Sequence, residues 1–243
     1  MNNGKQTKKA SGILRMAAAG LLATSVASAN IIVDGDFADA GGFPSASTIT
    51  PASNADSGWI RDSTWTRSGG EAKVQLNGGG AFSLGQIVTV SPVMSTDSTL
   101  TFDWQLDFSP TGGSEATEQM AFIYTVLGTN GGSDDLNLNS GDPDTNDDWT
   151  QLFTDTINET FTNDGTNKSA SGSVDETFAN AGFTYLGVVI RADTPSGDFS
   201  DYSMGTAAFL DNVTLTAPIP EPSSLLLLLV SGVTLLRRPR RRK

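Results

Sequence analysis

Short runs in which apolar and polar residues alternate dominate the pattern of this 243-residue chain. The clearest run is Leu100–Phe108, in which five apolar residues alternate with four polar ones. This period of two is typical of a β-strand with one buried face and one solvent face. The run Tyr185–Ile190 is almost entirely apolar, which predicts a central strand that is covered on both faces.

The rest of the pattern predicts further strands. Between residues 30 and 216 we find no long helical periodicity, and Gly, Ser, Thr, Asn and Asp recur at short intervals as turn signals. Many short strands without helices indicate an all-β fold, either a sandwich or a barrel. The other expected strands are 31–33, 72–76, 82–90, 120–127, 149–156, 171–178, 185–191 and 208–216.

The first 29 residues follow the pattern of a secretory signal peptide. Basic residues precede a stretch of small apolar residues at 16–26, and Ala27, Ser28 and Ala29 form an A-x-A cleavage site. An amphipathic helix that belongs to the mature domain is the alternative interpretation. We expect export through the secretion translocon, with cleavage that leaves Asn30 as the new N-terminus.

The C-terminal segment combines three features in a fixed order. Pro220, Glu221 and Pro222 come first, and because proline restricts its own φ and the residue before it, no unbroken helix passes through them. Residues 223–236 are mostly apolar, and as a helix they would extend roughly 21 Å, short of the ~30 Å hydrocarbon core of a membrane. Residues 237–243 carry six basic side chains, which stay cytoplasmic by the positive-inside rule.

This segment resembles the PEP-CTERM sorting signal of exported bacterial proteins. The resemblance implies recognition of the 220–222 motif by an exosortase-type processing protease, removal of the tail, and delivery to the cell surface or extracellular matrix. A plain single-span membrane anchor is the alternative. The expected organisation is a signal peptide at 1–29, one domain at 30–216, and a sorting tail at 217–243 with a short transmembrane segment that anchors the chain transiently.

The charge of the chain changes once both terminal segments are set aside. Residues 30–216 hold 26 of the 27 acidic residues and five of the 15 basic ones, a net formal charge of −21. Such a body repels phosphates, which argues against nucleic acid as a partner, and it attracts cations. The absence of Cys and His excludes disulfides, the usual serine triads and histidine-ligated zinc. Glycoside hydrolysis by paired carboxylates stays open.

The two ends of the body resemble the jelly-roll modules of galactose-binding-like and carbohydrate-binding domains. The opening segment 30–37 reads NIIVDGDF, and the closing segment 208–215 reads AFLDNVTL. The resemblance implies a single jelly-roll-like β-sandwich whose two termini lie together at one end.

Calcium is the candidate cofactor that this resemblance implies. In such modules an acidic residue of the closing strand and oxygens of the opening segment often hold a structural calcium, and the matching positions are Asp211, Asp36 and the Gly35 carbonyl. Ala38 stands where the modules have Glu, so an inherited site is altered. Asp211 alternates in phase with Val213, so we expect it to face the core, where a lone carboxylate is costly unless it is paired or metal-bound. A backbone hydrogen bond is the alternative role.

Three neighbouring residues are the candidates for contact with a glycan. Trp59 and Trp65 lie among Gly, Ser, Asp and Arg residues, and Arg61 between them offers hydrogen-bond donors to a sugar. Ordinary core packing is the alternative role for both indoles. Trp104, which lies within the alternating run, is expected in the core.

Together these patterns predict an exported, non-catalytic protein of the cell surface or extracellular matrix that is processed through its C-terminal tail. Extracellular polysaccharide is the candidate ligand. Two alternatives stay open: a secreted carbohydrate-active enzyme that uses paired carboxylates, and a purely structural surface scaffold.

Overall fold

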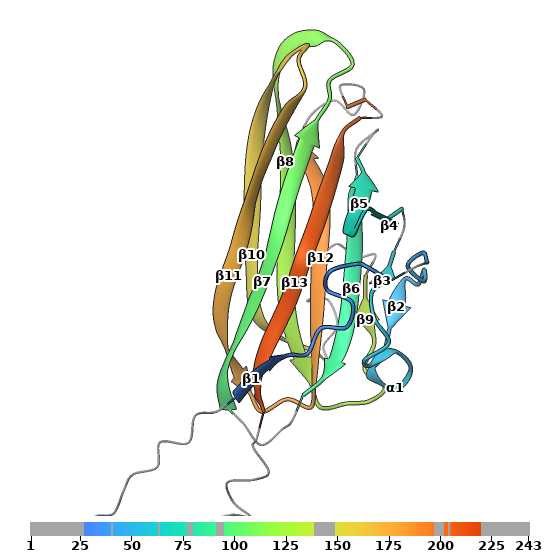
Figure 1. Cartoon of the computed structure of the whole chain (residues 1–243), viewed down its shortest axis with the longest axis vertical. Helices are drawn as coiled ribbons and strands as arrows, with labels where there is room; N and C mark the ends of the chain where they lie inside the picture. Colours follow the sequence, from blue (N-terminus) through green and yellow to red (C-terminus); the bar gives the residue numbers. More distant parts are fainter. Residues whose placement is uncertain are drawn as a thin grey trace, which may run out of the picture.

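Two β-sheets pack face to face as a sandwich whose strands run along its long axis (Figure 1). The computed structural model describes residues 27–39, 41–62, 64–76, 80–90, 95–138, 149–196, 202–203 and 205–219. Its elements are β1 (Ala27–Asn30), β2 (Thr48–Ile49), α1 (Pro51–Asn54), β3 (Ile60–Arg61), β4 (Thr66–Ser68), β5 (Glu71–Gln75), β6 (Ala81–Thr89), β7 (Ser95–Phe108), β8 (Gly113–Thr129), β9 (Leu136–Asn137), β10 (Thr150–Asp164), β11 (Lys168–Ala181), β12 (Tyr185–Ser196) and β13 (Ala207–Ile219).

The strand order confirms the expected all-β sandwich. The first sheet has the order β11-β7-β13-β5-β4, with β1 also paired to β13, and the second has the order β10-β8-β12-β6-β3. The chain crosses from one sheet to the other between most successive long strands, as in a jelly roll. Strands β2 and β9 form a separate two-stranded ladder.

The alternating run predicted at 100–108 lies within β7. Its apolar positions Leu100, Phe102, Leu106 and Phe108 are at most 1% exposed and form part of the main core between the sheets. Trp104 packs against this core but is only half-buried. The polar positions of the run 100–108 point to the outer face of the first sheet, which is the pattern expected of a strand with one solvent face.

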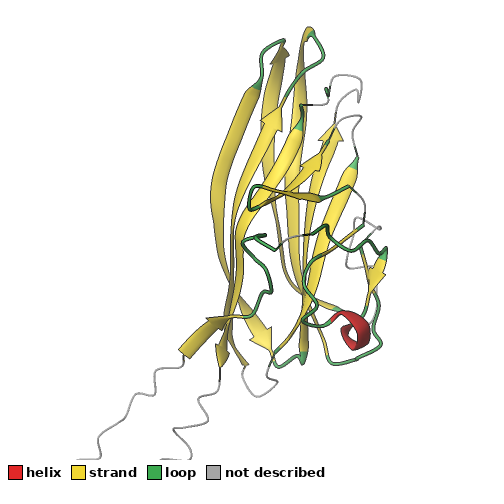
Figure 2. Cartoon of the chain, turned by 45° about the vertical axis from the view of Figure 1, so that its right-hand side comes forward, coloured by secondary structure: helices red, strands yellow, loops and turns green. Residues whose placement is uncertain are grey.

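The apolar strand predicted at 185–190 is covered on both faces, as expected. Leu186, Val188 and Ile190 fill the main core, whereas Val189 belongs to a second apolar cluster on the outer face of the second sheet. The cluster is completed by residues of β2, β3, β6, β8 and β9, together with Leu138 and the buried Trp149. The helical turn α1 lies outside the two layers (Figure 2).

Both ends of the described chain lie at the same end of the sandwich (Figure 1). Strand β1 pairs with the end of β13, with Ala27 opposite Ile219 and Asn30 opposite Thr216. This ladder extends past both domain boundaries expected from the sequence, and it contains the predicted cleavage residues Ala27 and Ala29. The two termini therefore meet as the jelly-roll resemblance implied.

The strand predicted at 31–33 is wrong, because β1 ends one residue earlier. The Val33 N–H donates to the Gln86 side-chain oxygen at 2.8 Å, so a buried amide replaces a neighbouring strand at this position. Strands β2, β3, β4 and β9 and helix α1 were not predicted, because two to four residues are too few to show a period.

The predicted sorting motif at 220–222, the apolar run after it and residues 1–26 lie outside the described residues. Within the part of the chain that the structure describes, no helix is both long and apolar enough to cross a membrane.

Candidate functional site

A row of side chains crosses the outer face of the first sheet. Each residue of the row lies directly opposite the next one on the neighbouring strand, in the order Ser171 on β11, Gln105 on β7, Phe209 on β13, Lys73 on β5 and Thr66 on β4. Five adjacent strands make this row roughly 19 Å long, given their usual spacing. The neighbouring row holds Ser173, Asp103, Asp211 and, on β5, Glu71. We call these two rows together the polar platform.

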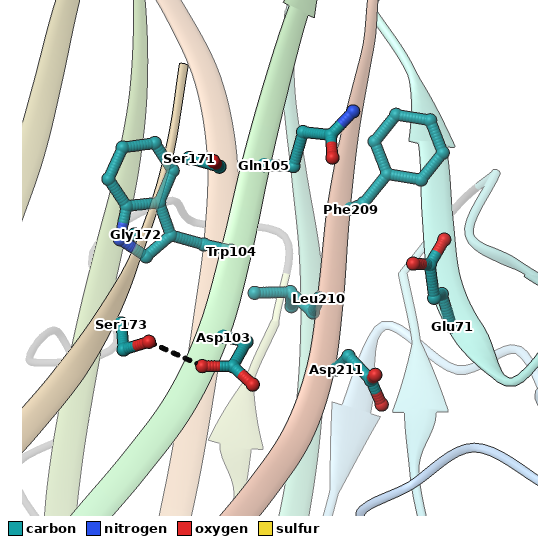
Figure 3. Close-up of a pocket in the computed structure, with 10 residues that line it drawn as sticks. All are labelled: Glu71, Asp103, Trp104, Gln105, Ser171, Gly172, Ser173, Phe209, Leu210 and Asp211. Carbon is teal, nitrogen blue, oxygen red and sulfur yellow. Dashed lines mark hydrogen bonds between the residues drawn. The ribbon is translucent and has the colours of Figure 1, made fainter. Parts of the chain in front are cut away.

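A shallow groove of about 320 Å³ lies within the polar platform. Figure 3 shows Gln105 and Phe209 side by side along one part of it, with Asp103, Asp211 and Glu71 along the other. These side chains occupy the solvent-facing positions of their strands. The core-facing residues between them, Trp104, Gly172 and Leu210, also line the groove.

Asp103 is held as a carboxylate by two donors. The Ser173 hydroxyl donates to Oδ1 at 2.5 Å, and the Asn212 amide donates to Oδ2 at 2.9 Å. Both hydrogen bonds favour the charged form, and the Ser173 bond is the largest contribution to lowering the pKa of Asp103 below its ordinary value. Asp103 is therefore ionised at neutral pH.

Asp211 lies directly opposite Asp103 across the two strands. Its Oδ1 accepts the backbone N–H of Asn212 at 2.7 Å, and its Oδ2 accepts the Asn212 side-chain amide at 3.2 Å. One neutral amide thus bridges two carboxylates on the platform.

A β-bulge decides which way Asp211 points. The register of β13 against β7 shifts between Asp211 and Thr214, and Asn212 has a left-handed φ of 51°. The extra residue places Phe209 and Asp211 on the outer face and Val213 in the core, with Val213 fully buried. The expectation that Asp211 faces the core was wrong, because simple alternation cannot register the extra residue.

Phe209 is the aromatic residue of the platform. Its ring is half-buried, and the Lys73 ammonium lies 5.0 Å from the ring centroid. A cation at this distance is attracted by the face of the ring. The platform therefore combines one apolar ring with hydroxyl, amide, carboxylate and ammonium groups.

The glycan-contact residues predicted from the sequence lie elsewhere. Trp59 and Trp65 are 1% and 0% exposed in the main core, where the Trp65 indole donates to the Phe82 carbonyl at 3.0 Å. Arg61 donates to the Phe43 and Trp65 carbonyls at 3.1 Å each. Because neither indole presents a face to solvent, core packing replaces sugar stacking as their role.

The three residues predicted to hold calcium have separate roles. The Gly35 carbonyl accepts the Val213 N–H at 2.8 Å, and a Cβ on Gly35 would lie 1.9 Å from the Val213 carbonyl oxygen. Asp36 is exposed and accepts the Ala38 N–H at 3.4 Å, while Asp211 faces the polar platform. Calcium here stays a prediction, to which this geometry adds no support.

The likeness of this chain to known proteins is confined to solved structures. No protein-family model matches it. No curated protein matches it either. One similar structure is TmCBM61 in complex with beta-1,4-galactotriose, at 12% identity over 77% of this chain and 97% of that chain, with a TM-score of 0.36. A second is the CBM22-2 xylan-binding domain of Xyn10C from Paenibacillus barcinonensis, at 14% identity over 79% of this chain and 99% of that chain, with a TM-score of 0.32. A third is CBM28, a carbohydrate-binding module specific for non-crystalline cellulose, at 16% identity over 73% of this chain and 98% of that chain, with a TM-score of 0.35. At these scores the likeness carries no argument about ligand or activity.

The sequence contained part of the signal for the polar platform. Asp103 and Gln105 occupy the polar phase of the clearest alternating run, so a solvent-facing position follows from periodicity alone. Phe209 was not recognised and Asp211 was expected to face the core, because the bulge after them reverses the apparent phase of the closing strand. That five strands bring these residues into two rows is visible only in the folded sheet.

Proposed function

We propose that this protein is an exported, non-catalytic binding protein that holds extracellular polysaccharide on its polar platform. The observation that carries the proposal is the row from Ser171 to Thr66, a solvent-facing strip of hydrogen-bonding groups with an aromatic ring at its centre. A polysaccharide offers many hydroxyls and apolar C–H faces, and such a strip matches both along an extended chain.

Asp103 does not have the property that the proton donor of a glycosidase needs. A glycosidase needs one carboxyl group with a raised pKa that serves as a proton donor. The pKa of Asp103 is instead lowered by the hydrogen bonds from Ser173 and Asn212. The groove is also shallow, so water stays in contact with both carboxylates. This supports binding over the alternative of a carbohydrate-active enzyme.

The proposed localisation of the protein is inferred from the two terminal segments. The signal peptide implies export, and the PEP-CTERM-like tail implies transient inner-membrane anchoring followed by processing and release to the cell surface or matrix. The pairing of β1 with the end of β13 supports this arrangement, because both membrane-directed segments then continue from one end of the sandwich. The polar platform lies along the side of the strands, where a membrane at that end leaves it accessible.

A binding experiment tests the platform directly. We expect the chain to bind at least one polysaccharide on a glycan array, and Phe209→Ala with Gln105→Ala to weaken that binding by about 3-fold to 10-fold in calorimetry. Thr177→Ala, on an exposed position of the same face but outside the groove, serves as the matched control and leaves affinity unchanged. Equal affinities for all three proteins would overturn the assignment to this face.

Incubation with the same polysaccharides in solution separates the alternatives. Release of reducing sugar would indicate an enzyme, and a complete absence of binding would favour a structural scaffold. Mass spectrometry of the exported protein tests the sorting proposal: we expect Asn30 at the N-terminus and loss of the segment after the 220–222 motif, whereas an intact C-terminus on the mature protein would contradict it.

A further inference from the structure

Two acidic side chains oppose each other along one part of the groove. Asp103 and Asp211 are a directly opposed pair on adjacent antiparallel strands, an arrangement that destabilises a sheet when both groups are charged. The group that bridges them, the Asn212 amide, is neutral. Ion pairs among the described residues join Arg67 to Asp34, Lys168 to Asp164 and Arg191 to Asp193, so none of these relieves the pair. The pair is therefore complementary to a cation from outside.

The hydrogen-bonding capacity that remains on the pair suits a compact donor. Each carboxylate offers about four lone-pair sites, and Asp103 and Asp211 each accept two hydrogen bonds from the protein. Acceptor sites therefore remain on both groups, and the carboxylate of Glu71 lines the same groove. A protonated amine brings one positive charge and three donors to these acceptors.

A metal ion fits the same place less well. Calcium takes six to eight oxygen ligands and usually several carboxylates in one cage. Within the part of the chain that the structure describes, no group of three or more acidic side chains is positioned to hold a metal ion. An ammonium group needs no such cage, since it binds through separate hydrogen bonds.

The charge of the whole body favours the same ligand. With a net formal charge of −21 between residues 30 and 216, the protein attracts cationic polymers over long distances and repels those rich in carboxylate or sulfate. Lys73 lies beside Phe209, and its charge repels an ammonium from the aromatic row. The carboxylate row and the aromatic row thus offer different chemistry to successive parts of one chain.

We propose that the groove selects polysaccharides that carry free amino groups, with a sugar ammonium bound on the solvent side of the Asp103–Asp211 pair, at the acceptor sites that Asn212 leaves open, and the sugar ring directed toward Phe209. This inference rests on the proposed function, because it assigns a ligand class to the same polar platform.

The test compares three probes by calorimetry on the full chain at slightly acidic pH. They are oligomers of β-1,4-linked glucosamine, the same oligomers fully N-acetylated, and oligogalacturonate. We expect the free-amine oligomer to bind about tenfold more tightly than its acetylated form at low salt, and oligogalacturonate to bind most weakly. The preference for the amine falls as salt is raised.

A charge-matched pair of variants locates the effect. Asp103→Asn with Asp211→Asn is expected to reduce the tenfold preference to near one. The control, Asp97→Asn with Asp175→Asn, removes the same charge from exposed positions outside the groove and keeps most of the preference. Equal losses in the two variants would show that net charge alone selects the amine and would overturn the proposed seat.

The remaining outcomes separate a failure of the amine proposal from a failure of the proposed polysaccharide binding. If the acetylated oligomer binds as well as the free amine, the amine proposal fails while the proposed polysaccharide binding stands. If no probe and no glycan on the array binds, both fail. If binding of a neutral glycan requires calcium and is lost with chelator, a metal-bridged contact replaces the ammonium.

Discussion

Arg67 fixes the opening segment of the body through three different contacts. Its guanidinium pairs with Asp34, donates to the Gly41 carbonyl at 3.1 Å, and lies 4.5 Å above the Phe43 ring centroid. The Asp34 side chain is only 4% exposed and adopts a left-handed φ of 54°. The pair therefore holds an irregular stretch of chain against the sheet, at a place where the backbone makes no strand pairing.

We expect Arg67→Met to lower the free energy of unfolding by about 3 kcal/mol, because it leaves the Asp34 carboxylate buried without its partner. Urea unfolding measures this loss, and adding Asp34→Asn is expected to restore part of it. Lys168→Met, which removes the exposed pair with Asp164, is the control and leaves the midpoint nearly unchanged. Similar midpoints for Arg67→Met and Lys168→Met would contradict the assigned role.

Tyr124 is a buried hydroxyl next to negative charge. Its ring centroid lies 5.1 Å from that of Phe102, and its hydroxyl donates to Asp155 at 3.4 Å. Burial, followed by the charges of Asp155 and Glu176, raises the pKa of Tyr124 from 10.0 to about 12. The folded state thus keeps this proton at a pH where the unfolded chain releases it.

Stability is therefore expected to fall as the pH rises from about 10 to about 12, by 2 to 3 kcal/mol from this residue alone. Below the pKa of the unfolded chain the contribution does not vary with pH. Urea unfolding at mildly and strongly alkaline pH measures the loss, and Tyr124→Phe is expected to show a shallower decline than the natural protein. A parallel decline in both proteins would assign the effect to other groups.

At the scale of elements, the bulge in β13 is the feature that builds the polar platform. One extra residue at Asn212 turns Asp211 outward while the core positions of the strand continue at Val213. Asparagine tolerates the left-handed backbone better than most residues, and its amide also reaches both neighbouring carboxylates.

Asn212→Val is expected to lower the free energy of unfolding by about 1 to 2 kcal/mol, since a β-branched residue is strained at this φ. Asn212→Gly relieves the backbone strain, so its stability should stay closer to that of the natural protein although the bridging amide is lost. Thermal unfolding of both variants makes the comparison. A greater loss in the glycine variant would mean that the amide bridge, and not the backbone, sets the cost.

Periodicity predicted the long strands well and the short ones poorly. The runs at 100–108 and 185–190 fall within β7 and β12, because burial on one face or on both imposes a readable pattern over many residues. The run at 31–33 is no strand, since the Gln86 side chain satisfies the Val33 backbone there. Trp59 and Trp65 were misjudged because polar neighbours in the sequence do not report which side chains the fold covers.

At the scale of the whole molecule, the charge is large for a body held together by one sandwich core. Residues 30–216 contain 26 acidic side chains against five basic ones. Three of the basic residues, Arg61, Arg67 and Lys73, lie in or next to β3, β4 and β5, so much of the surface is left with unopposed negative charge. Repulsion among these groups keeps the protein soluble and lowers the stability of the compact state.

Raising sodium chloride from about 0.01 M to about 1 M shortens the Debye length from about 30 Å to about 3 Å and should screen this repulsion. We expect the melting temperature to rise by a few degrees, as measured by circular dichroism. The Asp97→Asn and Asp175→Asn variant begins with less repulsion and should show a smaller rise. A melting temperature that falls with salt would indicate that favourable ion pairs outweigh the net charge.

The sequence by itself determined the all-β class, the long strands and the acidic body, and it carries the two terminal patterns from which export and sorting are predicted. These features depend on local spacing and composition, which do not change when the chain folds. Only the tertiary structure decided that Phe209 and Asp211 face outward, that Trp59 and Trp65 are buried, and that Asp103 meets Asp211 across β7 and β13. The reason is physical: register, a one-residue bulge and the closing of two sheets bring together residues more than 100 positions apart, and no local pattern records those contacts.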